Sequence, residues 1–517
     1  MVEENAGTPA DGPTLSRRVA AGAAWAQVSR VAEVASSIAL SLVLIRALGP
    51  TRFGHYSFLV NVATILAVFL SLGFPETVMR FVSIHLALDE LPQIRYLVRR
   101  LVVARVLVYG AGILLLFALR GSAISLHLPL IDRYWPAIAV LLVGQGAIEF
   151  STSYAYSRLR SRDVAIARTI GQVVALVFFG AVVVLGRTDV GTASLTVAIA
   201  YLSAGAMLFF RGLGQVLLRG SAAPTPLRPV AGFALGAWGT TLATIGLAGQ
   251  IDVVLLGALR NDAVQIALYS VATLVFVKLG TLLSGWAGTA MSSFADVDTR
   301  RGTAASRRLF GVYLRVSILL SLLAYPPIIL AADLVTRVAF GPPFAQAAGL
   351  MVAYGGFWLL SSLLAAGIPL SVMLALGKQR QAFAIRAGTG LLNVVLDLAL
   401  IPPLGALGAI IATGTANVLT HSGDFVIAAR QVGAAYPVAF AARVALAAAV
   451  AAVPGLLLRG FGPAGSLLGV ALYLVIFLAG LLLVKPVGQG EVELAGRFSP
   501  TAARWVARFA SEANPGD

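Results

Sequence analysis

A few ionisable side chains stand alone inside long apolar stretches of the sequence. Lys278 has no acidic residue close to it along the chain, and Glu149 follows Gly146 and precedes Phe150, far from any hydrophilic segment. A charge at the centre of a bilayer costs about 2.5 to 3.5 kcal/mol on insertion scales. Such a charge is therefore expected to have an oppositely charged partner or a functional role. The buried cation predicts contact with an anionic group such as phosphate, and the buried carboxyl predicts a proton or cation site.

Each of these residues also has a simpler interpretation. Lys278 could extend its ammonium toward the membrane interface, and Glu149 could be a protonated group hydrogen-bonded to a neighbouring helix. Arg30 and Glu33 lie three residues apart on one helical face, where they could neutralise each other as a structural ion pair. Asp252 and Asp397 are expected nearer the periplasmic ends of their helices, where capping or gate contacts explain them equally well. The candidate ion-coupling residues are Glu149, Glu33 and Asp252.

Other polar residues within the apolar stretches receive structural predictions. We expect interhelical hydrogen bonds from Asn393, Asn417, His421 and Asp424. Arginines close to the cytoplasmic ends of the predicted helices are expected to contact lipid headgroups, namely Arg105, Arg168, Arg315 and Arg386.

The sequence offers no pattern typical of catalysis. It contains no cysteine, which excludes disulfides, thiolate metal sites and cysteine nucleophiles. It also lacks a phosphate-binding glycine loop, zinc-ligand spacing and a clustered nucleophile and base. We therefore predict a protein that is not an enzyme and needs neither a cofactor nor a metal.

The elements that position these residues are membrane-spanning helices. Hydrophobic residues make up 59% of the 517 positions and charged residues 12%, against about 25% charged in an ordinary soluble protein. Apolar runs, each near the roughly 20 residues that cross a bilayer as a helix, recur from residue 24 to residue 484. The predicted fold is all-α, a polytopic membrane protein of about fourteen transmembrane helices. The net charge of +16 is spread over the connections, so nucleic acid is not an expected partner.

The distribution of Lys and Arg predicts how the chain is oriented. The two tails and every second connection carry roughly three times as many basic residues as the remaining connections, and cytoplasmic loops are the ones enriched in them. We therefore expect a multi-pass protein of the inner or plasma membrane with both termini in the cytoplasm.

Two segments recur along the chain at a nearly constant offset. Tyr56 and Ser57 match Tyr269 and Ser270, and a group of basic residues beginning at Arg160 recurs from Lys378. Such repeats are typical of transporters built from two related bundles. The predicted divisions are a disordered cytoplasmic tail (1–18), a lobe of six helices (19–211), a cytoplasmic linker (212–230), a second, pseudo-symmetric lobe of six helices (231–430), two additional C-terminal helices (431–485) and a cytoplasmic tail (486–517).

Three segments resemble a known family. They are "LIRALGPTRFGHY" at Leu44 to Tyr56, "SLGFPETVMRFVS" at Ser71 to Ser83, and the stretch from Pro369 to Ile411, which ends in "IPPLGALGAII". Together they resemble the bacterial oligosaccharide flippases of the multidrug/oligosaccharidyl-lipid/polysaccharide (MOP) superfamily.

The resemblance implies a two-lobed transporter that moves polyprenyl-pyrophosphate-linked oligosaccharide from the cytoplasmic to the periplasmic leaflet by alternating access. Its pathway would be the biosynthesis of a cell-surface polysaccharide: lipopolysaccharide O-antigen, exopolysaccharide or capsule. Its partners would be the lipid-linked substrate, membrane lipids and a polysaccharide polymerase with its export machinery. It also implies that Arg46 and Arg80 line the two mouths of the cavity, beside Lys278 and Arg30 as substrate-binding residues. The lipid II flippase branch carries several basic residues within its helices, and this sequence has only Arg30 and Lys278 there. The general polysaccharide branch therefore fits better.

Two alternatives stay open. One is a cation-coupled exporter of small molecules, similar to multidrug and toxin extrusion proteins, although such proteins use acidic pockets. The other is a polyprenyl-dependent membrane glycosyltransferase or polymerase, although the loops predicted outside the cytoplasm are short for an active site.

Overall fold

The computed structural model describes residues 12–121, 129–218, 220–247, 249–283, 287–365, 367–498 and 500–510. Side chains are described from Val31 onward, except at 243–244, 247, 283, 287–293, 295–301, 493–495, 497–498 and 500–502.

The first part of the chain forms a series of long helices. α1 reverses direction at Gly49, which has φ 68° and is followed by Pro50. Glycine tolerates this left-handed backbone and proline favours the first turn of a helix, so the Gly-Pro pair ends one segment and starts the next. The elements are α1 (Gly12–Ser71), α2 (Phe74–Ala87), α3 (Leu91–Ala118), α5 (Pro129–Arg133), α6 (Trp135–Ser157), α7 (Ser161–Val184), α8 (Val190–Leu208), the π-helix η1 (Phe209–Leu213) and α9 (Gly214–Leu218).

The second part repeats this pattern and adds a helical pair. α13 reverses at Gly302, which has φ 72°. The elements are α10 (Leu227–Thr244), η2 (Ile245–Leu247), α11 (Gly249–Arg260), α12 (Ala263–Leu283), α13 (Ala287–Leu330), α14 (Ala332–Leu334), η4 (Val335–Phe340), η5 (Pro342–Phe344), α15 (Ala347–Leu363), α16 (Ile368–Ala375), α17 (Gln379–Leu404), α18 (Ala406–Val432), α19 (Val438–Leu458), η6 (Arg459–Phe461), α20 (Gly462–Val484), α21 (Gln489–Phe498), α22 (Pro500–Val506) and η7 (Ala507–Phe509). The described residues contain no strand beyond an isolated bridge between Val487 and Ala510.

Ten helical stretches in the described part of the chain are long and apolar enough to cross a membrane. Two of them, Val31–Ser71 with 41 residues and Val438–Val484 with 47, exceed the roughly 20 residues of one crossing and contain a reversal at Gly49 and at Gly462. The all-α, polytopic membrane fold is thereby confirmed. The number of fourteen spans stays a prediction.

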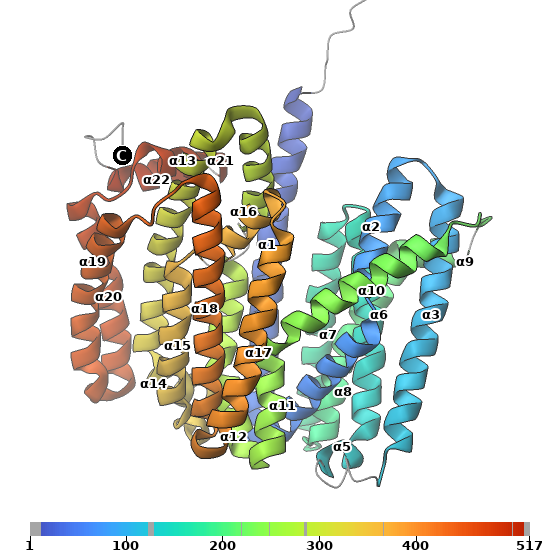
Figure 1. Cartoon of the computed structure of the whole chain (residues 1–517). Helices are drawn as coiled ribbons and strands as arrows, with labels where there is room; N and C mark the ends of the chain where they lie inside the picture. The colour runs from blue at the N-terminus through green and yellow to red at the C-terminus, as the bar shows by residue number, and fades with distance from the viewer. Residues whose placement is uncertain are drawn as a thin grey trace, which may run out of the picture.

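The helices form two groups and a flanking pair (Figure 1). α2, α3, α6, α7 and α8 make one group, and α13, α15, α17 and α18 make the other. α10 crosses diagonally in front of α2 and packs on both α2 and α17, whereas α19 and α20 pair with each other and lie against α13. The beginning of α1 and the C-terminal helices lie at the same end of the bundle, which we call the terminal end.

The two groups meet where the second half of α1 packs along α12. Phe58 on α1 and Tyr269 and Phe276 on α12 are among the largest fully buried side chains of this core. Gly54 of α1 has no room for a side chain, because a Cβ there would overlap the carbonyl of Ala263 at the start of α12. A glycine thus permits the close approach of the two helices.

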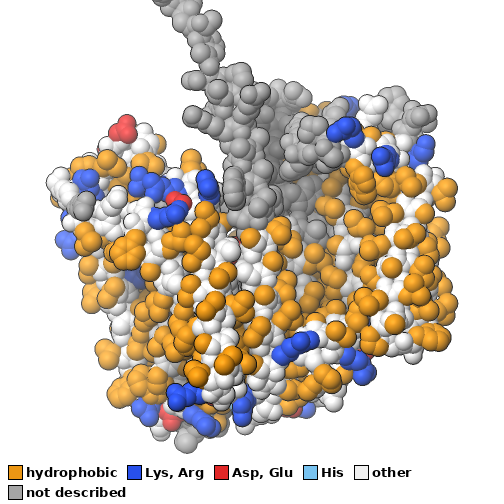
Figure 2. Space-filling model, turned by 180° about the vertical axis from the view of Figure 1, so that it is seen from behind, with side chains coloured by type: hydrophobic (Ala, Val, Ile, Leu, Met, Phe, Trp, Pro, Cys, Tyr) orange, Lys and Arg blue, Asp and Glu red, His pale blue; other side chains and the backbone are white. Residues whose placement is uncertain are grey.

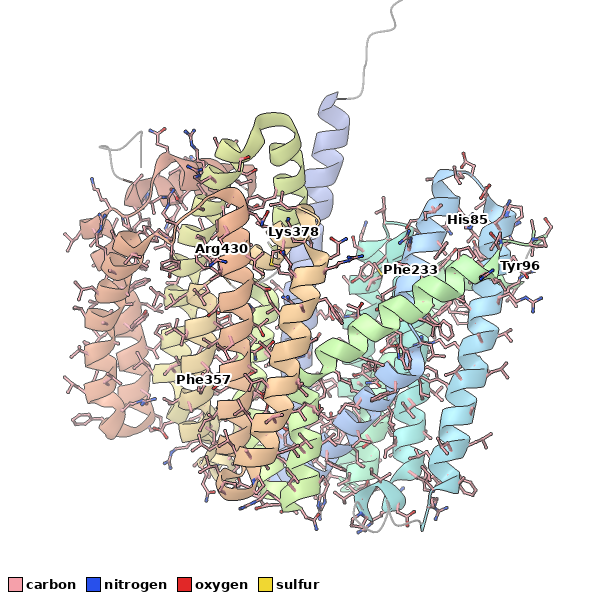
Figure 3. The ribbon with its side chains drawn as sticks, viewed as in Figure 1. His85, Tyr96, Phe233, Phe357, Lys378 and Arg430 are labelled. Atoms are coloured by element: carbon pink, nitrogen blue, oxygen red, sulfur yellow. The ribbon has the colours of Figure 1, made fainter. Side chains whose placement is uncertain are left out.

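The outer surface is that of a membrane protein. Figure 2 shows a broad band of hydrophobic side chains, with Lys and Arg gathered toward its two ends. Large apolar side chains such as Leu107, Val177 and Leu457 are more than half exposed. In Figure 3, Lys378 and Arg430 lie toward the terminal end of the second group and His85 at that end of the first. Exposing such an apolar band to water is unfavourable, whereas contact with lipid is favourable. The chain is therefore a multi-pass membrane protein.

Candidate functional site

Charges of alternating sign form a row from the first group of helices to α12. We call Arg105, Glu149, Arg168, Glu33 and Lys278 the charged row. Arg105 of α3 donates to Glu149 of α6 at 2.7 Å, and Arg168 of α7 donates to Glu33 of α1 at 3.0 Å. Electrostatic interactions link Glu149 to Arg168 and Glu33 to Lys278. Five helices therefore contribute one charged side chain each.

Neighbouring polar groups position Glu149 and its partner Arg105. Gln145 lies one turn before Glu149 on α6 and donates to the hydroxyl of Thr64 on α1 at 2.8 Å. Arg105 also donates to the carbonyl of Gly146 at 3.1 Å and to the Tyr109 hydroxyl at 3.0 Å. These contacts orient α6 so that Glu149 faces Arg105, with its side chain 37% exposed.

Lys278 ends the row on α12. Its side chain is half-buried and forms no ion pair or hydrogen bond with any described group, although it interacts electrostatically with Glu33. The row holds three cations and two carboxylates, so it carries one excess positive charge. A flexible ammonium with free donors, placed where water is scarce, is suited to bind an anionic oxygen.

A second polar site is buried among α11, α12, α17 and α18. We call Asp252, Asn393, Asp397, Thr413 and Tyr269 the oxygen cluster. Asp252, Asn393 and Asp397 are 0% exposed. Asn393 donates to Asp252 at 3.1 Å and to Asp397 at 3.3 Å, and Asp252 also accepts from the hydroxyls of Tyr269 and Thr413.

The oxygen cluster joins four helices at a break in one of them. Asp252 lies in the first turn of α11, just after the irregular segment η2, and a helix start favours negative charge. The carbonyl of Gly246 in η2 accepts from Asn393 at 2.8 Å. Thr413 comes from α18 and Tyr269 from α12, so any ligand held here would touch α11, α12, α17 and α18 together.

Two buried carboxyl groups in contact repel each other unless a proton or a cation lies between them. The side-chain oxygen of Asn393 and one oxygen of Asp397 have no hydrogen-bond partner in the described residues. The atoms that could bind a ligand here are all oxygens. Oxygen ligands suit a proton or a hard cation such as sodium and not a soft transition metal. The described residues contain no group of three or more His, Cys, Asp or Glu placed to hold a metal ion.

Arg46 and Arg80 make contacts away from both sites. Arg46 donates to the carbonyls of Val338 and Ala339 in η4, the second at 2.8 Å, and so fastens α1 to η4. Arg80 lies with its guanidinium 4.6 Å from the ring centre of Phe233, which projects from α10 (Figure 3). Arg30 belongs to the stretch of α1 whose side chains lie outside the described residues, and the structure pairs Glu33 with Arg168.

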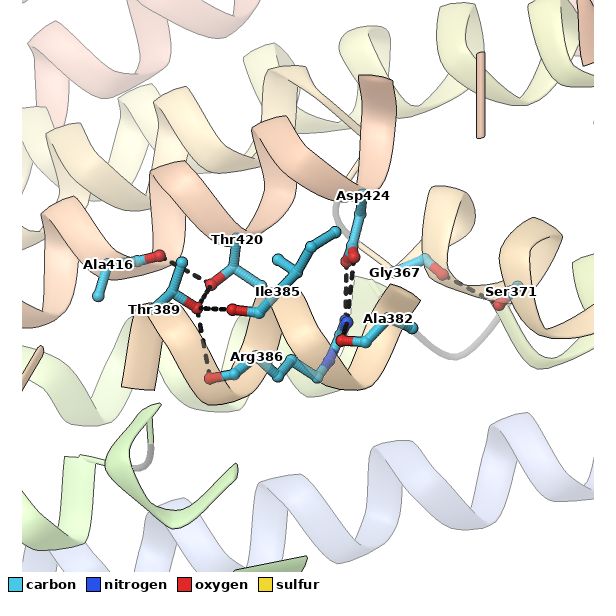
Figure 4. A network of polar contacts seen from close by, with 9 residues as sticks. All are labelled: Gly367, Ser371, Ala382, Ile385, Arg386, Thr389, Ala416, Thr420 and Asp424. Carbon is cyan, nitrogen blue, oxygen red and sulfur yellow. Dashed lines mark hydrogen bonds and ion pairs between the residues drawn. The ribbon is translucent and has the colours of Figure 1, made fainter. Parts of the chain in front are cut away.

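The predicted headgroup anchors are in fact partners of acidic residues on other helices. Arg386 of α17 makes two parallel hydrogen bonds to Asp424 of α18, at 3.0 and 2.7 Å (Figure 4). Arg315 of α13 pairs with Glu491 of α21. The anchor prediction is wrong for Arg105 and Arg386, because their side chains are only 6% and 17% exposed and each meets a carboxylate. Arginine suits such buried pairs because its planar donors match a carboxylate.

Asp252 and Asp397 lie side by side at full burial, with Asp252 in the first turn of α11. The capping or gate role expected of them stays a prediction. The interhelical hydrogen bonds expected of Asn393 and Asp424 are confirmed. Sequence reasoning missed the connection between Asp252 and Asp397. Part of this site could have been found from the spacing of Asn393 and Asp397, which are four residues apart and hence lie on one face of a helix.

The fold is shared with transporters of the MOP superfamily. The lipid II flippase MurJ, in an inward closed conformation, has a TM-score of 0.65 and 13% identity, with 88% of this chain and 97% of that one covered. An inward-facing multidrug resistance MATE family transporter has a TM-score of 0.59 and 11% identity, with 79% and 98% covered. A MOP superfamily transporter from Pyrococcus furiosus, described as having a binding pocket of reverse polarity, has a TM-score of 0.57 and 13% identity, with 80% and 95% covered.

The family follows from the sequence match. The family model for polysaccharide biosynthesis proteins matches residues 19–291, more than half of the 517 residues. The chain therefore belongs to the polysaccharide biosynthesis protein family, as the resemblance at Leu44 to Tyr56 and Ser71 to Ser83 predicted. Comparison with curated protein sequences gives no match.

Proposed function

We propose that the protein translocates a polyprenyl-pyrophosphate-linked oligosaccharide from the cytoplasmic to the periplasmic leaflet of the inner membrane. The observation that carries the proposal is the charged row, which ends in a half-buried lysine between the two groups of helices. Family membership supports it, and so does the fold shared with a protein described as a lipid II flippase.

The headgroup is the part of the substrate that cannot cross a bilayer unaided. A pyrophosphate carries negative charge into a medium that solvates it poorly. Lys278 supplies a positive charge and hydrogen-bond donors at that point, and the Arg168–Glu33 pair holds the neighbouring potential near neutral. The single excess positive charge of the row attracts this anion.

The oxygen cluster provides the coupling site. When a proton or sodium ion binds between Asp252 and Asp397, it draws α11 and α17 together and removes the repulsion of the carboxylates. α11 continues from α10, the helix that crosses to α2. Occupancy of the cluster can therefore alter the contact between the two groups of helices, which is the motion that alternating access requires.

The remaining features of the proposal follow from charge and chemistry. Both termini lie in the cytoplasm, because basic residues mark that side, and the terminal end faces the cytoplasm. The protein acts as a carrier without catalysing a covalent step. A polymerase and export machinery on the periplasmic side would consume the flipped substrate.

The test is a leaflet-resolved assay in vesicles. The purified protein is reconstituted with a fluorescent undecaprenyl-pyrophosphate oligosaccharide, and an external glycosidase reports how much sugar has reached the outer leaflet. Protein-dependent exposure of the inner-leaflet substrate is the expected result. Complete protection of several glycans, together with uptake of an organic cation by the same vesicles, would overturn the proposal in favour of a small-molecule exporter.

A further inference from the structure

A large apolar groove lies within the first group of helices. Its volume is about 610 Å³, and it is bounded by α3, α6, α8, η1 and α9. Val106, Ile113, Val143 and Phe210 are among its lining side chains. No described residue of the second group lines it, so it is separate from the contact between the two groups.

The groove opens toward the hydrophobic surface of the protein. Val106 and Phe210 line it and are nonetheless 66% and 77% exposed, and Leu107 beside Val106 is 67% exposed. In a membrane these positions face lipid, because water does not reach the hydrocarbon region. A hydrocarbon chain can therefore enter from the bilayer without crossing water.

One wall of the groove contains a guanidinium. Arg105 lines the groove and is 5% exposed, with Nε bonded to Gly146 and Nη2 to Glu149 and Tyr109. Its Nη1 has no hydrogen-bond partner in the described residues. A buried donor without a partner costs about 1–3 kcal/mol. An oxygen atom that reached Nη1 from the groove would remove this cost.

The terminal end of the groove is basic. Arg95 and Arg99 lie on the same face of α3 as Val102, Val106 and Ile113, one to two turns nearer the terminal end. Arg99 donates to the carbonyls of Leu217 and Gly220, and Arg95 to that of Ser221. In Figure 3, Tyr96 marks this end of α3. The arginines thus lie next to the terminal end of the groove, where Arg99 contacts the lining residue Leu217.

The length of the groove selects one acyl chain. From Val102 to Ile113 a helix rises about 16 Å at 1.5 Å per residue. One leaflet of a hydrocarbon core about 30 Å thick is close to 15 Å deep. A fatty acyl chain of a membrane phospholipid has this reach, whereas a polyprenyl tail is far longer than the groove.

We propose that this groove binds one anionic phospholipid from the leaflet at the terminal end. One acyl chain fills the space between α3, α6 and α8. The phosphate lies beside Arg95 and Arg99, as in other basic pockets between membrane helices, and an ester carbonyl oxygen accepts a hydrogen bond from Arg105. The site shares Arg105 with the charged row, but the proposal does not rest on the proposed flipping function.

The test uses phosphatidylglycerol that carries a photoactivatable diazirine in one acyl chain. The full-length protein is reconstituted in phosphatidylcholine vesicles with this probe, irradiated and mapped by mass spectrometry. We expect labelling to concentrate at residues 102–113 and 143–151. We also expect it to fall at least tenfold in Gly110→Trp, because Gly110 lines the groove and a Cβ there meets open space.

The matched control is Gly180→Trp on α7, where a Cβ likewise meets no atom within 4 Å and which lies outside the groove. Its labelling pattern should equal that of the wild type. A double variant, Arg95→Gln with Arg99→Gln, should retain the acyl labelling but lose the preference for phosphatidylglycerol over a phosphatidylcholine probe. Uniform labelling around the protein, an unchanged pattern in Gly110→Trp, no preference between the two lipids, or preferential labelling of the groove by a polyprenyl phosphate probe would each overturn the proposal.

Discussion

The hydroxyl oxygens of Ser57 and Ser270 lie 2.6 Å apart. These two serines occupy equivalent places in the internal repeat, one on the second half of α1 and the other on α12. Symmetric residues that touch each other must lie close to the axis that relates their surroundings. The buried neighbours Phe58 and Tyr269 pack beside them. The contact therefore marks the place where the two halves of the molecule are held together.

We predict that joining these two positions covalently stops transport. The chain has no cysteine, so Ser57→Cys with Ser270→Cys creates the sole thiol pair. Adjacent hydroxyls at 2.6 Å place the two side chains within reach of a disulfide. Oxidation should reduce flipping in the vesicle assay at least tenfold, because alternating access requires α1 and α12 to separate, and a reductant should restore it.

The single variants Ser57→Cys and Ser270→Cys control for the loss of the hydroxyls and should respond to neither oxidant nor reductant. Full transport by the oxidised double variant, with the disulfide confirmed by mass spectrometry, would show that α1 and α12 stay together throughout the cycle.

The second prediction concerns the positive charge of Lys278. Lys278→Ala removes the excess charge of the charged row and should lower flipping at least tenfold, whereas Lys278→Arg should keep most of it. The assay is glycosidase access in vesicles at equal protein levels. Inorganic pyrophosphate should inhibit the wild type more strongly than Lys278→Ala. Wild-type flipping by the alanine variant would remove Lys278 from the substrate site.

The third prediction concerns coupling through the oxygen cluster. Asp252→Asn and Asp397→Asn each remove a charge that a bound proton or sodium ion would balance. Both variants should still fold, since an amide can replace a neutral carboxyl in the hydrogen bonds to Asn393 and Thr413. We expect flipping in these variants to lose its response to an imposed proton or sodium gradient.

Asp333→Asn is the matched control, because Asp333 lies outside the cluster and is 44% exposed. It should respond to the gradient like the wild type. If Asp252→Asn and Asp397→Asn also respond like the wild type, the coupling ion binds elsewhere, and Glu149 becomes the residue to test.

The fold was predictable because bilayer thickness imposes a strong pattern on sequence. Apolar runs and their flanking arginines suffice to indicate an all-helical, two-part membrane protein. The repeat also indicated which positions correspond, such as Ser57 and Ser270. It could not show that they touch, because the distance between two bundles depends on packing details such as the absent side chain of Gly54.

The candidate sites were predictable only in part, because ion pairs between helices depend on rotation and depth. Lys278, Glu149 and Glu33 were recognisable as isolated charges. Their association through Arg168 was not, since Arg168 lies beside a loop in sequence and resembles a headgroup anchor. The oxygen cluster was hidden for a similar reason. Asp252 lies in the first turn of α11, just after η2, and no hydropathy pattern places this helix start in the interior.

The last prediction tests how much a buried ion pair contributes to the stability of the second group of helices. Arg386 and Asp424 join α17 to α18 with two hydrogen bonds, and Thr389 and Thr420 meet one turn away at 2.7 Å. Removing one partner leaves the other charge buried and unpaired, which typically costs about 3–5 kcal/mol. Asp424→Ala should therefore lower the melting temperature of the purified protein markedly.

The double variant Arg386→Met with Asp424→Leu removes both charges and should melt closer to the wild type, because no unpaired charge remains. This comparison separates the burial of an uncompensated charge from the loss of the pair itself. Equal destabilisation of the single and double variants would mean that the pair stabilises the fold by its own attraction, and that apolar packing cannot replace it.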